Sequence, residues 1–186
     1  MTSSAIAIVQ LTRPVLAQYL ADLLELERLV VAELGIAYDV HPWGVPEFEL
    51  EVPSKWDFSW SAVDTATDKA VGCLVVSRFG DNLHAHRNIV HPDYRRHGIA
   101  SRFLEHHFAK AQAAGLNYFT AQVPYDNRAS RDWYLNRGFG LLKDEGLAWY
   151  MDARGSTDEN ARDHLATPEG QWWVVRYTIS DYTPPA

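Results

Sequence analysis

The stretch that most constrains the fold is LHAHRNIVHPDYRRHGIAS, at residues 83–101. Residues 83–90 alternate as a β-strand does, and His91-Pro92-Asp93 then ends the strand. Beyond a short basic loop, apolar side chains recur at helical spacing, at Ile99, Phe103, Leu104, Phe108 and Ala111. The sequence therefore predicts a strand that passes through a basic loop into the start of a helix.

This arrangement brings unpaired backbone amides and the positive end of a helix dipole to one point, where an anion can bind. Gly98 allows close approach of the backbone, Ala100 leaves the first helical turn uncrowded, and Ser101 can add a hydroxyl donor. We interpret the loop as a cradle for a pyrophosphate. The alternative is an ordinary strand–loop–helix turn with solvated arginines.

Residues 90–100, VHPDYRRHGIA, resemble the acyl-CoA-binding signature of the GNAT superfamily of N-acetyltransferases, whose core is Q/R-x-x-G-x-G/A. Arg95, Gly98 and Ala100 occupy its three defined positions. Residues 127–139, NRASRDWYLNRGF, are similar to the second signature of that superfamily, with Trp133 in place of the usual phenylalanine and Tyr134 as the usual tyrosine. Two signatures in this order are more specific than either alone.

The order of the expected elements also resembles the GNAT fold. Strands are expected at 5–11, 58–66, 70–79, 83–90, 117–123, 140–152 and 171–180, helices at 13–34, 98–114 and 127–138, and an irregular segment at 36–57. The resemblance implies an α+β, three-layer fold with a mixed, mostly antiparallel sheet of six to seven strands, flanked by helices and splayed at its centre. We expect one domain over residues 1–186, with a polar insertion at 153–170 and a loose tail at 181–186.

The resemblance implies acetyl-CoA or another short acyl-CoA as co-substrate. Ile89 and Val90 would bond the pantetheine arm, and the Val90 amide would be the oxyanion donor. The cradle would consist of Arg95, Arg96, His97, Gly98, Ile99, Ala100 and Ser101. Asn127 and Arg131 could reach the pantetheine or the nucleotide phosphate, although a helix cap and a solvated arginine explain them equally.

His84 and His86 are two residues apart on one strand and so share a face. Their placement is similar to the arylalkylamine N-acetyltransferase branch, where paired histidines relay the amine proton through water. A structural pair of surface histidines is an alternative, as is a metal site that includes His91, but no further ligand is evident and no metal is expected. The resemblance makes Tyr134 the general acid, because a phenol with a pKa near ~10 stays protonated; packing its ring on the core is compatible.

The irregular segment at 36–57 mixes aromatic and acidic residues with three prolines. A long loop of this kind can form the wall of an acceptor pocket, apolar with a few polar anchors. We assign Tyr38, Trp43 and Phe48 to that wall. Aromatic residues that only pin the loop to the core are the alternative.

Bulk properties exclude several classes of function. The net charge of −7 argues against a nucleic-acid partner, and no apolar stretch is long enough to span a membrane. The only cysteine, Cys73, lies in an apolar run and excludes a disulfide framework, and the N-terminus lacks a secretory signal. We therefore expect a cytoplasmic monomer or homodimer that acetylates a small-molecule primary amine; the alternatives are acetylation of a protein N-terminus or lysine, and a CoA-binding sensor without catalysis.

Overall fold

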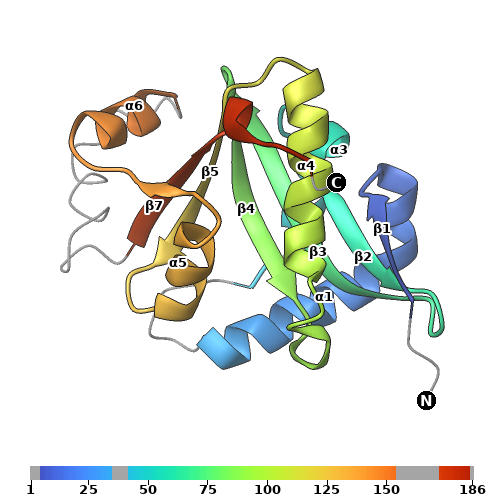
Figure 1. Ribbon diagram of the computed structural model, residues 1–186. Helices are drawn as coiled ribbons and strands as arrows, with labels where there is room; N and C mark the ends of the chain where they lie inside the picture. The colour runs from blue at the N-terminus through green and yellow to red at the C-terminus, as the bar shows by residue number, and fades with distance from the viewer. Residues whose placement is uncertain (1–4, 35–41, 154–171, 185–186) are drawn as a thin grey trace. The chain divides into compact units, whose positions relative to one another are not determined.

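A computed structural model of the chain describes residues 5–34, 42–153 and 172–184 (Figure 1). Its strands form a seven-stranded sheet in the order β1-β2-β3-β4-β5-β7-β6, flanked by helices. The chain divides into two compact units: Met1–Ser77 with His86–Lys110, and Arg78–Ala85 with Ala111–Pro185. β3 (Lys69–Phe79) and β4 (Asn82–Val90) each contribute residues to both units. The predicted α+β fold with a mostly antiparallel sheet is confirmed.

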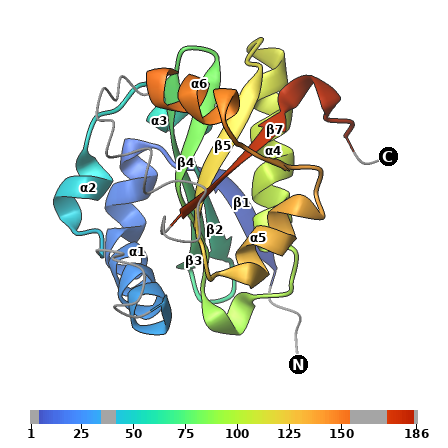
Figure 2. The ribbon, with the colours of Figure 1, turned by 90° about the vertical axis from the view of Figure 1, so that its left-hand side faces the viewer.

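The first unit contains β1 (Ile6–Gln10), β2 (Trp60–Asp64), most of β3, the second half of β4, the helix α1 (Arg13–Leu34) and most of the helix α4 (Ile99–Ala113). β1 pairs with β2 and β2 with β3, both antiparallel. Cys73 and Val75 on β3 pack in one cluster with leucines of α1, whereas Gly72 faces Phe103 of α4. Figure 2 shows α1 on one side of these strands and α4 on the other.

The segment after α1, expected to be irregular, contains two short helices, α2 (Val45–Glu49) and α3 (Lys55–Phe58). α2 forms because Pro46 fixes a helical φ in the first turn and the Glu47 carboxylate accepts a hydrogen bond from the Gly44 amide, at 2.8 Å. Local capping therefore overcomes the helix-breaking composition of the segment.

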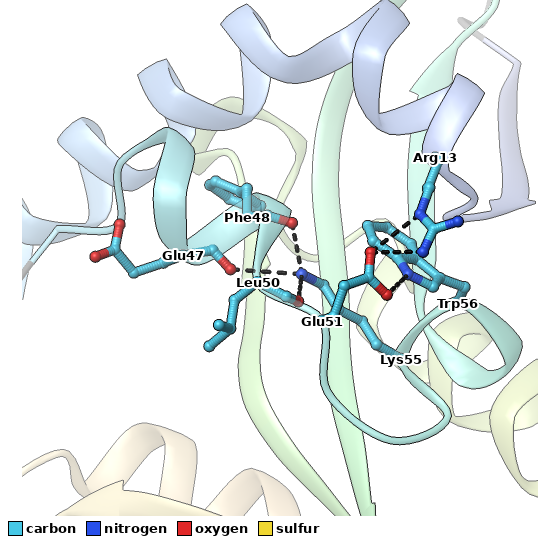
Figure 3. A network of polar contacts seen from close by, with 7 residues as sticks. All are labelled: Arg13, Glu47, Phe48, Leu50, Glu51, Lys55 and Trp56. Atoms are coloured by element: carbon cyan, nitrogen blue, oxygen red, sulfur yellow. Dashed lines mark hydrogen bonds and ion pairs between the residues drawn. The ribbon is translucent and has the colours of Figure 1, made fainter.

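A buried lysine holds these two helices together (Figure 3). Lys55 is 1 % exposed, and its ammonium donates to the carbonyls of Phe48 at 2.5 Å and Leu50 at 2.9 Å, with that of Glu47 at 3.4 Å. The carbonyls of Glu47 and Phe48 belong to the last turn of α2 and that of Leu50 to its C-cap, where a cation binds favourably. Burial lowers the pKa of Lys55, and the carboxylate of Glu51 opposes this shift.

A second buried titratable group, His107 on α4, makes stability depend on pH. Burial lowers the pKa of His107 to about 4, and its Nδ1 lies 3.2 Å from the carbonyl of Phe58. In the unfolded chain a histidine has a pKa of about 6.5, so between these values the unfolded state binds more protons and stability falls as the pH falls. The cost from His107 is about 2 kcal/mol between pH 7 and pH 5.

We therefore predict that the free energy of unfolding falls less between pH 7 and pH 5 in His107→Gln than in the native protein. Urea denaturation at the two pH values measures this difference. The matched control is His106→Gln, because His106 is the adjacent residue and is exposed. An equal dependence on pH in both variants would contradict the assignment.

The second unit is built on β5 (Tyr118–Pro124). β5 pairs in parallel with β4, from Asn82↔Tyr118 to Ala85↔Ala121, and antiparallel with β7 (Trp172–Thr178), which also pairs with β6 (Gly140–Leu141). The ladder between β4 and β5 has four residue pairs, and both strands are longer than this ladder. The helices of this unit are α5 (Arg128–Leu135) and α6 (Glu145–Ala153), and the 3-10 turn Ile179–Asp181 follows β7.

The strand expected at 140–152 is wrong beyond Leu141, because residues 145–153 form α6. Leu147, Tyr150 and Met151 pack in one cluster with Leu142 and Val174. The first three lie at i, i+3 and i+4, the spacing of one helix face. The insertion predicted at 153–170 lies almost wholly outside the described residues. Within the described ranges, no helix has the length and apolarity that crossing a membrane requires.

Candidate active site

The first part of the candidate site is the loop between β4 and α4. After the 3-10 turn Pro92–Tyr94, Arg96 and Gly98 take left-handed backbone conformations, with φ of 63° and 75°. Gly98 does so without strain, because a glycine has no Cβ. α4 makes its first internal hydrogen bond from the Arg102 amide to the Gly98 carbonyl, so the amides of Ile99 and Ala100 have no partner within the helix. This geometry fits a bound phosphate group.

Arg95, predicted in the cradle, has a structural partner. Its guanidinium forms an ion pair with Glu33 of α1, and its Nε donates to the Val90 carbonyl at 3.2 Å. The hydrogen bond from Arg95 lowers the pKa of Glu33. The side chain of Arg95 therefore ties the loop to α1 and to the end of β4, whereas those of Arg96 and His97 are exposed.

His86, on β4, lies in the first unit beside part of the predicted acceptor wall. The Trp43 ring is 6.3 Å from the His86 ring between centroids, and Phe48 meets Trp43 edge-on at 5.3 Å. Phe48 is fully buried and Trp43 half-buried. The third predicted wall residue, Tyr38, lies outside the described residues.

A buried serine orients the His86 ring. The Ser77 hydroxyl lies 2.6 Å from His86 Nε2, and Ser77 is fully buried. A serine hydroxyl can donate to an imidazole nitrogen or accept from it, so the direction of this hydrogen bond follows the His86 tautomer. The contact therefore holds the orientation of the imidazole ring through Nε2.

His84 lies in the second unit and is 2 % exposed. Its Nδ1 is 3.1 Å from the hydroxyl of Thr120 on β5, which also accepts from the Asn82 side-chain amide at 2.9 Å. The Tyr150 hydroxyl, from α6, lies 3.3 Å from Nδ1 and 3.4 Å from Nε2 of the same ring. His84 is thus part of a buried polar cluster and not of a surface pair.

α5 carries the other residues of the second signature. Asn127 caps the helix, because its side-chain oxygen accepts from the Ser130 amide at 3.1 Å. Arg131 forms an ion pair with Asp132 at 2.9 Å. Tyr134 is 6 % exposed and its ring packs edge-on against Phe139 at 4.8 Å between centroids.

Sequence reasoning missed the residues that contact the two histidines, which are Ser77, Thr120, Tyr150 and Arg87, and it missed Glu27, which binds Arg87. Of these residues, only Glu27 could have been noticed in the sequence. It is the one acid in the series of residues that recur at 3/4 spacing along α1 and are otherwise apolar. The contact of Tyr150 with His84 could not be predicted, because the segment that contains Tyr150 was expected to be a strand.

A thiol nucleophile and a bound metal ion are two further ways in which a site of this kind could activate a substrate. Burial, together with the negative charge of Glu27, raises the pKa of the Cys73 thiol, so the nucleophilic thiolate is disfavoured. Across residues 5–34, 42–153 and 172–184, no cluster of three or more histidine, cysteine or acidic side chains could hold a metal ion.

A surface hollow of about 270 Å³ lies elsewhere in the first unit and contains none of the predicted site residues. Its lining is Arg13, Leu16, Ala17, Leu20, Glu49, Glu51 and Trp56. Glu51 closes one side by bonding Arg13 and the Trp56 indole nitrogen, at 3.0 and 2.8 Å (Figure 3).

Comparison with known proteins agrees with this geometry. Residues 23–139, more than half of the chain, match the Acetyltransferase (GNAT) family. The chain belongs to the GNAT family of acetyltransferases. It is accordingly an acyl-CoA-dependent N-acetyltransferase.

Solved structures show the same fold at low sequence identity. The ribosomal-protein-S18-alanine N-acetyltransferase of Escherichia coli is 16% identical, with a TM-score of 0.65 over 96% of this chain and 97% of that one. A GNAT-family acetyltransferase of Staphylococcus aureus Mu50 is also 16% identical, with a TM-score of 0.66 over 94% and 99%. The PaiA N-acetyltransferase of Thermoplasma acidophilum, solved with coenzyme A, is 13% identical, with a TM-score of 0.58 over 94% and 99%.

Proposed function

We propose that the enzyme transfers an acetyl group directly from acetyl-CoA to a small-molecule primary amine. The observation that carries this proposal is the position of Trp43 beside His86, with Phe48 behind Trp43. An aromatic wall next to a titratable imidazole suits an acceptor with an apolar body and a reactive amine. Arylalkylamines have this chemistry, in keeping with the histidine spacing on β4.

Different residues bind the carrier, stabilise the oxyanion and accept the proton of the amine. The amides at the start of α4 bind the pyrophosphate of the carrier, with Asn127 and Arg131 as further contacts. The Ile89–Val90 backbone bonds the pantetheine, and the Val90 amide stabilises the oxyanion that forms when the amine attacks the thioester carbonyl. His84 and His86 relay the proton that the amine loses.

Tyr134 completes the step. When the tetrahedral intermediate collapses, the C–S bond breaks and the phenol proton passes to the departing thiolate. The products are then the N-acetyl amide and free coenzyme A. No acyl-enzyme forms, because the most obvious nucleophile, Cys73, is buried and its pKa is raised.

The test is release of coenzyme A thiol from acetyl-CoA in the presence of single acceptors. The panel contains 2-phenylethylamine, tryptamine, spermidine, free amino acids, an aminoglycoside, and peptides with a free N-terminus or an internal lysine. We expect kcat/KM to be highest for the arylalkylamines. Preference for peptides would instead establish a protein N-acetyltransferase, and acetyl-CoA binding without thiol release across the panel would establish a sensor.

A further inference from the structure

Glu27 is an acid inside the apolar face of α1. It is 1 % exposed, and the leucines at 23 and 26 on the same helix are buried with it. A buried carboxylate destabilises a fold unless charged and hydrogen-bonding partners compensate it, and apolar replacements of buried ion pairs are often neutral or stabilising. The stability of the fold therefore does not explain why a glutamate occupies position 27.

The two carboxylate oxygens of Glu27 bind two different segments. Oε1 accepts from Arg87 Nε of β4 at 2.8 Å, and Oε2 accepts from the backbone amide of Trp43 at 3.2 Å. The Arg87 side chain is 18% exposed, so this ion pair is largely shielded from water. One side chain thus links α1, the entrance to α2 and β4.

These links converge on His86. The Arg87 guanidinium stacks over the Trp43 ring at 4.3 Å, and its Nη1 donates to the His86 carbonyl at 3.0 Å. The charges of Glu27 and Arg87 compensate each other, and the guanidinium covers a face of the ring that would otherwise attract an ammonium ion. A wall of this kind favours the neutral amine, which is the form that attacks a thioester.

We propose that Glu27 is a positioning residue that holds Trp43 and Arg87 beside His86 and thereby sets the affinity for the amine acceptor. This proposal rests on the proposed function, because it requires that Trp43 and His86 line the acceptor site. Glu27 itself touches neither substrate; it acts through the two residues that it binds.

The test compares three proteins with the native enzyme: Glu27→Gln, the double variant Glu27→Leu/Arg87→Met, and Glu25→Gln. The last is the control, because Glu25 lies on the same helix and pairs with Arg28 at the surface. For 2-phenylethylamine we expect KM to rise at least tenfold in the first two variants and to stay within twofold in the control. The Kd of acetyl-CoA should stay within twofold in all three.

The double variant separates positioning from stability. It leaves no unpaired buried charge, so its urea midpoint should fall less than that of Glu27→Gln, while its KM should be raised at least as much. A native KM in the double variant, or a rise in KM that only follows loss of stability, overturns the proposal.

A native enzyme that acetylates no amine of the panel would refute the proposed function instead. The positioning claim is then decided by hydrogen exchange at the Trp43 amide. We expect exchange at least tenfold faster in Glu27→Gln than in Glu25→Gln, and equal rates overturn the claim.

Discussion

Replacing Tyr134 with phenylalanine should lower kcat about 100-fold, because the departing thiolate loses its proton donor. The Kd of acetyl-CoA should stay within twofold, since the ring remains and only a hydroxyl is removed. Steady-state thiol release with 2-phenylethylamine gives kcat, and titration calorimetry gives the Kd.

The chain offers a matched control for this change. Tyr177 on β7 also packs its ring on Phe139, at 5.1 Å between centroids, and so has the same aromatic neighbour as Tyr134. Tyr177→Phe should leave kcat within about twofold. If both variants lost activity equally, packing around Phe139 would explain the effect and the general-acid role would be refuted.

Replacing Lys55 with methionine should lower the free energy of unfolding by about 3 kcal/mol. The methionine fills similar volume but leaves the last carbonyls of α2 without the ammonium that they accept from (Figure 3). Urea denaturation at pH 7 measures the change.

Lys69→Met is the control for this substitution, because Lys69 is exposed at the start of β3. Its expected effect is within about 0.5 kcal/mol. If Lys55→Met cost no more than Lys69→Met, the ammonium of Lys55 would not stabilise α2, and the link between α2 and α3 would depend on other contacts.

The sequence predicted the elements around the β4–α4 loop well, for local reasons. About ten consecutive residues are enough to specify a strand that is ended by a proline. About ten are also enough to specify a helix whose apolar residues recur at 3/4 spacing. The cap at Asn127 is equally local, since its side chain bonds an amide three residues away. Such features depend little on the rest of the chain.

At residues 140–152, the secondary structure predicted from the local sequence was wrong. The run of apolar and aromatic residues from Leu141 fits a strand or a helix by composition. Burial of Tyr150, Met151 and Leu142 against Val174 of β7 decides for the helix. That partner lies more than twenty residues away, so the choice was made by packing.

By itself, the sequence determined the family and the strand, loop and helix at residues 83–101, because each follows from short patterns of neighbouring residues. Only the tertiary structure decided what surrounds the histidines. Glu27 and Arg87 are separated by 60 residues, and His84 and Tyr150 by 66. Contacts of that kind depend on which side chains the packed helices and strands bring within hydrogen-bonding distance, and no local pattern encodes them.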